Sequence, residues 1–397
     1  MNHDGELRGS YVKSFLPRPA STESLLVEWA HLADAKSMPS SENTPVSEAE
    51  TIRRILESLP ELIPSLRIED IRRAVVLGTG RKVDALANAR VGGKTQELLF
   101  EVKSLGEPRI VEQAIMQLRS YVRSRPGAYP VLAAPYLSER SREICKSEKV
   151  GYVDLAGDAY LQFGSVLVDR AGAEGRTVEK RSLRTVFAPK ATRVLRTLLQ
   201  QPSEPTTVTK LAKTCSMSPA GVFLVVDLLD KKGFVTRGGD RSIVLAEPDR
   251  LLREWAKNWT WEKSPVSYFF SFDKTADQIM ARVAKTSKRL GIEYALTGMA
   301  GASLIAPFVR FADVSFYLRS GKETLVKEMD LRPVSSGANV VILDPYDEGV
   351  FAGVREIRGS RVVSDIQLFV DLFNYPARGQ EQAEALFEQV IKFPRAS

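Results

Sequence analysis

The chain has 397 residues, a formal net charge of +7 and a sequence pI of 9.2. At about 100–200 residues per domain this length predicts a multidomain protein, and a hydrophobic content of 44% excludes an intrinsically disordered chain. No apolar run approaches the roughly 18 residues of a membrane span, and the opening residues lack the apolar core of a signal peptide. We therefore expect a cytoplasmic protein without a membrane partner.

Cysteine and histidine usage excludes several kinds of site. The two cysteines, Cys145 and Cys215, stand far apart, so neither a disulfide framework nor a cysteine zinc site is expected. The two histidines, His3 and His31, leave residues 32–397 without a Ser-His-Asp triad or an HExxH metal site. Catalysis there would have to use carboxylates, lysine and bound metal. The positive charge favours a polyanionic partner.

The front half of the chain predicts a flexible segment followed by an α/β domain. Residues 1–45 are polar, and a stretch rich in Ser, Pro and Glu is typical of a flexible N-terminal segment. Helical and strand patterns then alternate over residues 46–185. Ser47 and Glu50 have the spacing of a capping box at the start of the first helix. Predicted helices cover 47–63, 107–125 and 138–149, and predicted strands cover 74–78, 82–90, 96–105, 129–137 and 150–163.

A compact helical unit is predicted over residues 186–247. Helical patterns cover 190–201, 207–215 and 219–233, and a hairpin with Gly238-Gly239 at its tip covers 234–247. Three helices and a glycine-tipped hairpin within about 60 residues are typical of a winged helix-turn-helix.

Basic residues of this unit indicate double-stranded DNA as its partner. From Val186 to Leu245 there are nine Lys and Arg residues against four Asp and Glu residues. The expected DNA contacts are Lys190, Arg193, Arg196, Lys210, Lys213, Ser216, Ser218, Arg237 and Arg241. The third helix, capped by Ser216 or Ser218, is poor in base-reading groups, and Val222, Leu224, Val225, Leu228 and Leu229 are expected in the core. We therefore expect phosphate contacts and insertion of the wing into the minor groove, with packing or dimerisation as the alternative role.

Residues 248–397 predict a further α/β domain. Strand patterns cover 267–272, 314–320, 339–345 and 355–364, and helical patterns cover 273–291 and 378–393. Thr297-Gly298 and the segment 300–303 resemble the turn and helix start with which nucleotidyltransferase folds hold a triphosphate, although a structural glycine turn fits as well. Asp313 lacks the acidic partner that metal binding in such enzymes requires. We expect a nucleotidyltransferase-like fold that transfers no nucleotide.

Two carboxylates and a lysine form a candidate metal site in the first α/β domain. Glu101 and Lys103 lie two residues apart on one strand, so their side chains leave the same face. A hairpin partner strand can bring Asp84 beside them. Two carboxylates and phosphate oxygens suit Mg²⁺ or Mn²⁺, and the lysine could orient an attacking water and offset the charge that develops on the phosphate. The alternative is an edge strand with a solvated Glu–Lys pair.

Gln117 and Tyr121, four residues apart on the following helix, extend this pattern. Over residues 50–165 the order Asp, Glu-x-Lys and Gln-x-x-x-Tyr resembles the RecB-like branch of the PD-(D/E)XK nucleases. The resemblance implies a restriction-endonuclease-like fold, a metal held by Asp84 and Glu101, and all five residues in the catalytic site. The histidine usual upstream in that branch has no equivalent, and Glu57 or Glu61 could substitute for it only in part.

A second resemblance rests on four segments, namely 151–161, 247–256, 294–310 and 362–386. Through these segments, residues 150–395 resemble the AbiEi-type antitoxins and transcriptional regulators of type IV toxin–antitoxin systems. It implies a bacterial regulator that binds its own promoter, as a homodimer where the operator is two-fold symmetric, and that antagonises a toxin without a stable complex. The alternative is a Mg²⁺-dependent DNA endonuclease of a defence system, targeted by its winged helix. An adjacent toxin gene would favour the regulator.

Overall fold

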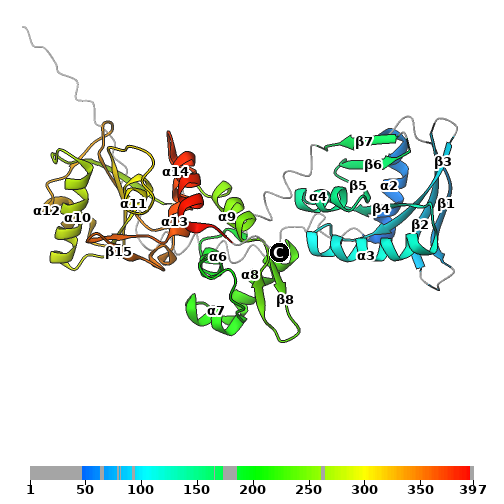
Figure 1. The fold of residues 1–397 in the computed structure, drawn as a ribbon, viewed down its shortest axis with the longest axis horizontal. Coiled ribbons are helices and arrows are strands. Elements are labelled where there is room, and N and C mark those ends of the chain that lie inside the picture. The colour runs from blue at the N-terminus through cyan, green and yellow to red at the C-terminus, as the bar shows by residue number, and fades with distance from the viewer. Residues whose placement is uncertain are drawn as a thin grey trace, which may run out of the picture. The chain divides into compact units, whose positions relative to one another are not determined.

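The computed structural model describes residues 47–62, 67–77, 80, 82–91, 94–164, 166–172, 186–260 and 264–393, so the predicted flexible segment 1–45 lies outside the described residues. The mixed α/β class is confirmed. Within the described residues there are two seven-stranded sheets and a two-stranded hairpin (Figure 1).

The first sheet has the strand order β1-β2-β3-β4-β5-β6-β7. Strands β1 to β3 form an antiparallel meander, β4 and β5 continue parallel to β3, and β6 and β7 return antiparallel. Strand β1 begins well before the predicted residue 74, and β7 was not predicted because it is short. The elements are α2 Glu48–Leu62, β1 Arg67–Val76, β2 Lys82–Val91, β3 Lys94–Val102, α3 Pro108–Ser124, β4 Tyr129–Ala134, α4 Glu139–Ser147, β5 Gly151–Asp154, β6 Ala159–Phe163 and β7 Val166–Arg170.

Helices cover both faces of this sheet. Phe100 of β3 packs in a buried cluster with α2, whereas Leu99 packs in a second cluster with α3 and α4. Because side chains alternate along a strand, Glu101 and Lys103 leave β3 on the side of Leu99. The sheet thereby determines which face carries the candidate site.

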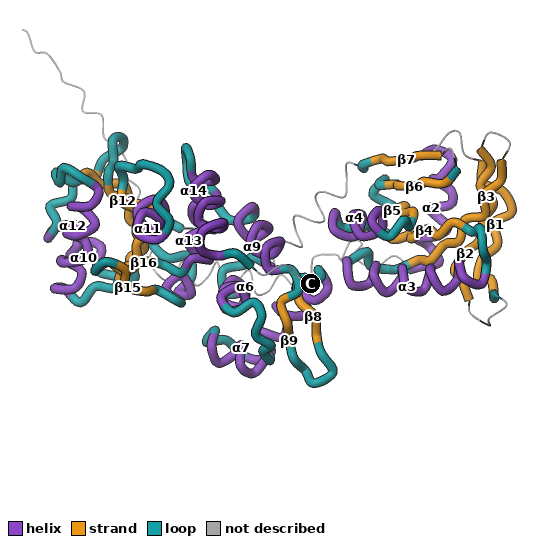
Figure 2. Tube along the Cα trace, in the orientation of Figure 1, coloured by secondary structure: helices purple, strands orange, loops and turns teal. Residues whose placement is uncertain are grey.

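The helical unit contains the three helices and the hairpin that the sequence predicts (Figure 2). Ser218 caps α8, because its hydroxyl accepts a hydrogen bond from the Gly221 amide at 3.1 Å, whereas Ser216 lies in the preceding turn with φ at +52°. The expectation that Leu224 is a core residue is wrong, because the phase of the helix turns it outward. The elements are α6 Ala191–Gln200, α7 Val208–Thr214, α8 Pro219–Lys231, β8 Val235–Arg237 and β9 Ile243–Leu245.

The second sheet has the order β13-β10-β14-β12-β11-β16-β15. Its pairs β12–β14 and β11–β16 are parallel, and its other pairs are antiparallel. The elements of this part are α9 Pro248–Lys257, β10 Val266–Phe270, α10 Ala276–Leu290, β11 Tyr294–Thr297, α11 Gly298–Ile305, β12 Val314–Leu318, α12 Lys322–Glu328, β13 Arg332–Pro333, β14 Val340–Leu343, β15 Arg355–Ile357, β16 Ser360–Val362, α13 Asp365–Phe373 and α14 Gly379–Leu386.

One hydrophobic core crosses the predicted domain boundary at residue 247. Leu195 and Leu198 of α6 lie in the same buried cluster as Trp255 of α9 and Phe369 of α13. The helical unit and the helices of the C-terminal part therefore stabilise one another. Residue 247 follows the hairpin, but the same hydrophobic core continues on both sides of it along the chain.

Among the described helices, no single one is long and apolar enough to cross a membrane. Helices α7 and α8 meet the length and hydropathy requirement only when taken together, and they are bent by 115° at the turn between them.

Candidate metal and DNA-binding sites

The structure brings Asp84, Glu101 and Lys103 together at one end of β2 and β3. The antiparallel register pairs Ala85 with Phe100, which places Asp84 directly across from Glu101. The Lys103 Nζ lies 2.6 Å from the Glu101 Oε1, and the Asp84 Oδ2 accepts a hydrogen bond from the Val102 amide at 2.7 Å. Two carboxylates and one ammonium group thus share one small region of the sheet.

Burial sets the electrostatics of this region. The Glu101 side chain is almost fully buried, and this burial raises its pKa; the hydrogen bond from Lys103 opposes the shift, and the Asp84 charge adds to it. Burial alone would lower the pKa of Lys103, but the hydrogen bond to Glu101 and the surrounding carboxylates raise it overall. Lys103 is therefore a cation whose hydrogen bond partly offsets the effect of burial on the pKa of Glu101.

Tyr121 anchors α3 beside the strand that carries Asp84. Its ring is buried, and its hydroxyl donates a hydrogen bond to the Lys82 carbonyl at 3.2 Å. Gln117 is exposed one turn earlier on the same helix. Within the described residues, no hydrogen bond joins the Gln117 side chain to Asp84 or Glu101, so the structure unites three of the five predicted site residues.

A third carboxylate near this cluster was missed by sequence reasoning. Glu48, in the first turn of α2, is close enough to raise the pKa of both Glu101 and Lys103. Glu57, expected as a partial substitute for the upstream histidine, instead binds Arg53 on the exposed side of α2, and the side chain of Glu61 lies outside the described residues. The only sequence signal for Glu48 was its place beside Ser47 at the capped helix start. Among the described residues there is no group of three or more His, Cys, Asp or Glu side chains with metal-ligand geometry.

Several arginines that were expected to contact DNA bind other residues of the protein instead. Arg193 makes two hydrogen bonds to the buried carboxylate of Asp347, at 2.7 and 2.8 Å, and Arg196 is buried in the core. Arg237 stacks over the Phe223 ring and lies within ion-pair distance of Asp227. Arg193 and Arg196, which were both expected to contact phosphate, are instead held by acidic and polar partners from the C-terminal part.

The remaining expected cations are exposed. Lys190, Lys210, Lys213 and Arg241 have high exposure, and within the part of the chain that the structure describes none of them has an ion-pair partner. Lys210 and Lys213 lie on α7, and Arg241 lies at the hairpin tip with φ at +65°. These exposed side chains can therefore bind a polyanion, from α7 and from the hairpin tip.

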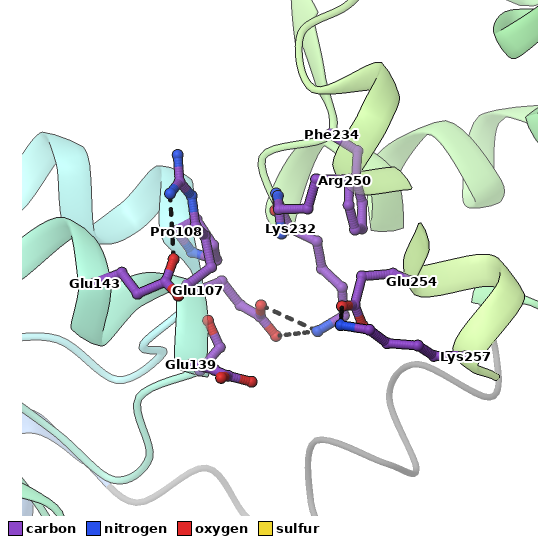
Figure 3. A pocket seen from close by; sticks show the side chains of 11 residues that line it. Glu107, Pro108, Glu139, Glu143, Lys232, Phe234, Arg250, Glu254 and Lys257 are labelled. Carbon is purple, nitrogen blue, oxygen red and sulfur yellow. Dashed lines mark hydrogen bonds and ion pairs between the residues drawn. The ribbon is translucent and has the colours of Figure 1, made fainter. Parts of the chain in front are cut away.

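The side chain of Lys232 is buried, and it lines a pocket of about 230 Å³ (Figure 3). Its ammonium group lies 3.3 Å from a carboxylate oxygen of Glu107, which precedes α3. Arg140 of α4 makes a further hydrogen bond to Glu247 at 2.8 Å. Charge on this side of the helical unit is neutralised by the first α/β domain.

The glycine turn of the C-terminal part is tightly packed. Gly298, with φ at +55°, begins α11, and a Cβ there would lie 3.0 Å from the Tyr375 ring. The Tyr375 hydroxyl donates a hydrogen bond to Asp313. The other carboxylate nearby, Asp371, is fully buried and accepts hydrogen bonds from Thr297 and Tyr317. Packing accounts for the conformation of this turn.

These features define a mixed α/β protein that combines a carboxylate–lysine cluster with a cation-bearing helical unit. Residues 244–392 match the model of a family described as "Transcriptional regulator, AbiEi antitoxin, Type IV TA system". The resemblance of the C-terminal part to these antitoxins is thereby confirmed over that range.

Solved endonuclease structures are also similar to part of the chain. A repair endonuclease from Pyrococcus abyssi is 22% identical with a TM-score of 0.22, over 29% of this chain and 49% of that one. An EndoMS–double-stranded DNA complex is 24% identical with a TM-score of 0.22, over 30% of this chain and 48% of that one. This chain thus spans about half the length of these structures. A search of curated protein sequences found no match.

Proposed function

We propose that this protein is a DNA-binding transcriptional regulator of the AbiEi type, and that its helical unit is a winged helix-turn-helix. The observation that carries the proposal is the set of exposed, unpaired cations on α7 and at the hairpin tip, in a chain whose C-terminal part matches the antitoxin regulators. Lys210, Lys213 and Arg241 can neutralise phosphates on either side of a helix placed in a groove. We infer its own promoter as the target, with a homodimer where the operator is symmetric.

The test is the salt dependence of binding to duplex DNA. Replacing both Lys210 and Lys213 by alanine is expected to lower the slope of log K against log salt by about two units, because each neutralised phosphate contributes about one. The matched control replaces Lys285 and Lys288, two exposed lysines of α10, and should leave the slope unchanged. A slope unaffected by the α7 substitutions would contradict the proposal.

A second candidate function is metal-dependent cleavage of DNA by the first α/β domain, which we propose to have a PD-(D/E)XK-like fold. The assembly of Asp84, Glu101 and Lys103 supports it. Asp84 and Glu101 would hold Mg²⁺ or Mn²⁺, and Lys103 would face the attacked phosphate. Glu48, whose charge raises the pKa of Glu101 and of Lys103, would be a further carboxylate in the neighbourhood of that metal.

Metal binding and cleavage separate the roles of these residues. Asp84→Asn is expected to abolish Mn²⁺ binding in titration calorimetry, because one carboxylate ligand is lost, whereas Lys103→Ala should retain binding and lose any cleavage of single- or double-stranded DNA. Glu57→Gln, on the exposed side of α2, is the control and should change neither. Undiminished Mn²⁺ affinity in Asp84→Asn would show that no metal binds at this cluster.

For the C-terminal part we propose a nucleotidyltransferase-like fold that antagonises a toxin without a stable complex. Asp313 is hydrogen-bonded to Tyr375, the strand that follows it carries no second acidic residue, and among the described residues no group of three or more His, Cys, Asp or Glu side chains could hold a metal ion. Incubation with labelled nucleoside triphosphates and Mg²⁺ is therefore expected to label neither this protein nor RNA. Labelling that disappears in Asp313→Ala would contradict the expectation.

A further inference from the structure

The outward side of α8 is apolar. Phe223 is 48% exposed and Leu224 is 64% exposed, and Ala220 is exposed beside them. The opposite side of the helix, with Val222 and Leu229, is fully buried in the core. Adjacent exposed apolar residues on one helix are typical of a binding surface.

Positive charge lies on two elements next to this helix. Helix α7, which carries the exposed Lys210 and Lys213, and strand β8, which leads to the exposed Arg241 at the hairpin tip, both pack against α8 (Figure 1). Within α8, the one acidic residue of its middle turns, Asp227, is paired with Lys231 at 2.8 Å. An exposed apolar helix face with exposed cations on the elements packed against it matches a major groove, where phosphates flank the base edges.

The chemistry of these side chains restricts what they can recognise. No hydrogen-bonding group is present in the side chains of Ala220, Phe223 and Leu224. These side chains therefore cannot recognise the hydrogen-bond donors and acceptors on the base edges. The apolar feature that the major groove offers is the C5-methyl group of thymine, and Ala and Phe are among the side chains that contact it. The Arg237 guanidinium, centred 5.2 Å from the Phe223 ring centroid, packs against that ring.

We propose that Ala220, Phe223 and Leu224 recognise C5-methyl groups in the major groove, so that the protein prefers thymine-containing sites. This inference rests on the proposed DNA binding and specifies the DNA feature that is recognised. A second copy of this chain or another protein on the same face is an alternative that the experiment below detects.

The test compares duplexes of one length that differ only at the pyrimidine C5 position. Alternating A-T duplex is compared with alternating A-U duplex, and G-C duplex is compared with its 5-methylcytosine form. Affinity is expected to fall on the order of tenfold when the methyl groups are absent, because each methyl group buried against an apolar side chain contributes about fourfold and two such contacts multiply. The salt slope should be the same for all four duplexes, since phosphate contacts are unchanged.

Variants identify the side chains responsible. The double variant Phe223→Gln with Leu224→Gln should bring the ratio of A-T to A-U affinity to about one, and Leu224→Gln alone should lower this ratio. The control is Met116→Gln, an exposed apolar residue of α3, which should leave the ratio unchanged.

Equal affinity for A-T and A-U duplex with a normal salt slope would overturn methyl recognition and leave DNA binding intact. Absence of salt-dependent binding to every duplex would overturn the proposed function itself. A changed sedimentation coefficient in the double variant, with the affinity ratio preserved, would assign the face to protein contact and also overturn the inference.

Discussion

Replacing Arg196 by alanine is expected to lower the free energy of unfolding by about 3–5 kcal/mol, the usual cost of removing one partner from a buried charged network. Arg196 is 1% exposed, and its Nη2 donates hydrogen bonds to the Gln367 Oε1 at 2.6 Å and to the Tyr346 hydroxyl at 2.8 Å. Gln367 in turn donates to the Asp371 carboxylate at 2.8 Å. Loss of the guanidinium leaves these acceptors and the buried carboxylate without their cation.

Urea denaturation of the full chain measures this effect. Arg196→Met, which keeps the packing volume against the Trp255 ring but removes the charge, should recover part of the loss. Lys190→Ala, an exposed cation just before the same helix, should stay within about 0.5 kcal/mol of the native protein. A loss below about 1 kcal/mol in Arg196→Ala would mean that the network contributes little to stability.

Asp371→Asn is expected to change how stability depends on pH. Burial raises the pKa of Asp371 from 3.8 to about 7, while hydrogen bonds from Thr297, Gln367 and Tyr317 oppose the shift. The folded state then holds the proton more tightly than the unfolded state. Between about pH 4 and pH 7, Asp371 ionises readily only in the unfolded chain, so the free energy of unfolding of the native protein falls as the pH rises through this range. The asparagine has no proton to lose in this range. Relative to the native protein, the variant should therefore gain stability with rising pH, by on the order of 1 kcal/mol per pH unit within this window.

The measurement is the free energy of unfolding of both proteins in urea at intervals between pH 4 and pH 8. A control substitution of an exposed carboxylate on the same part of the chain, Glu388→Gln, should run parallel to the native protein. A constant difference between Asp371→Asn and the native protein across this range would show that Asp371 does not change protonation there.

This network also bears on how the helical unit functions. Arg196 lies on α6, whereas Gln367 and Asp371 lie on α13, and both helices belong to one hydrophobic cluster. The DNA-binding helices that we propose are therefore held by the antitoxin-like part of the chain. A fragment that ends at residue 247 would expose the apolar side of α6, so experiments on DNA binding require the full chain.

Much of the fold followed from local patterns. The capped start of α2, the alternation along β3 and the glycine-tipped hairpin each depend on residues that are close in sequence, and the structure contains all three. Asp84 could be placed beside Glu101 for the same reason, because an antiparallel hairpin brings together residues that are equally distant from its turn. Strand β7 and the early start of β1 were missed, because short or charged strands carry a weak periodic signal.

By itself, the amino-acid sequence determined the order of elements, the carboxylate–lysine cluster and the resemblance of the C-terminal part to the antitoxins. The tertiary structure decided which charges are available. Arg193 and Arg196 pair with Asp347 and Gln367, more than a hundred residues away along the chain, so no local pattern could separate them from exposed Lys210. Likewise, Leu224 became a surface residue only once packing had selected which side of α8 faces the core. Local periodicity depends on neighbours in sequence, whereas the partner of a charge and the buried side of a helix depend on neighbours in space.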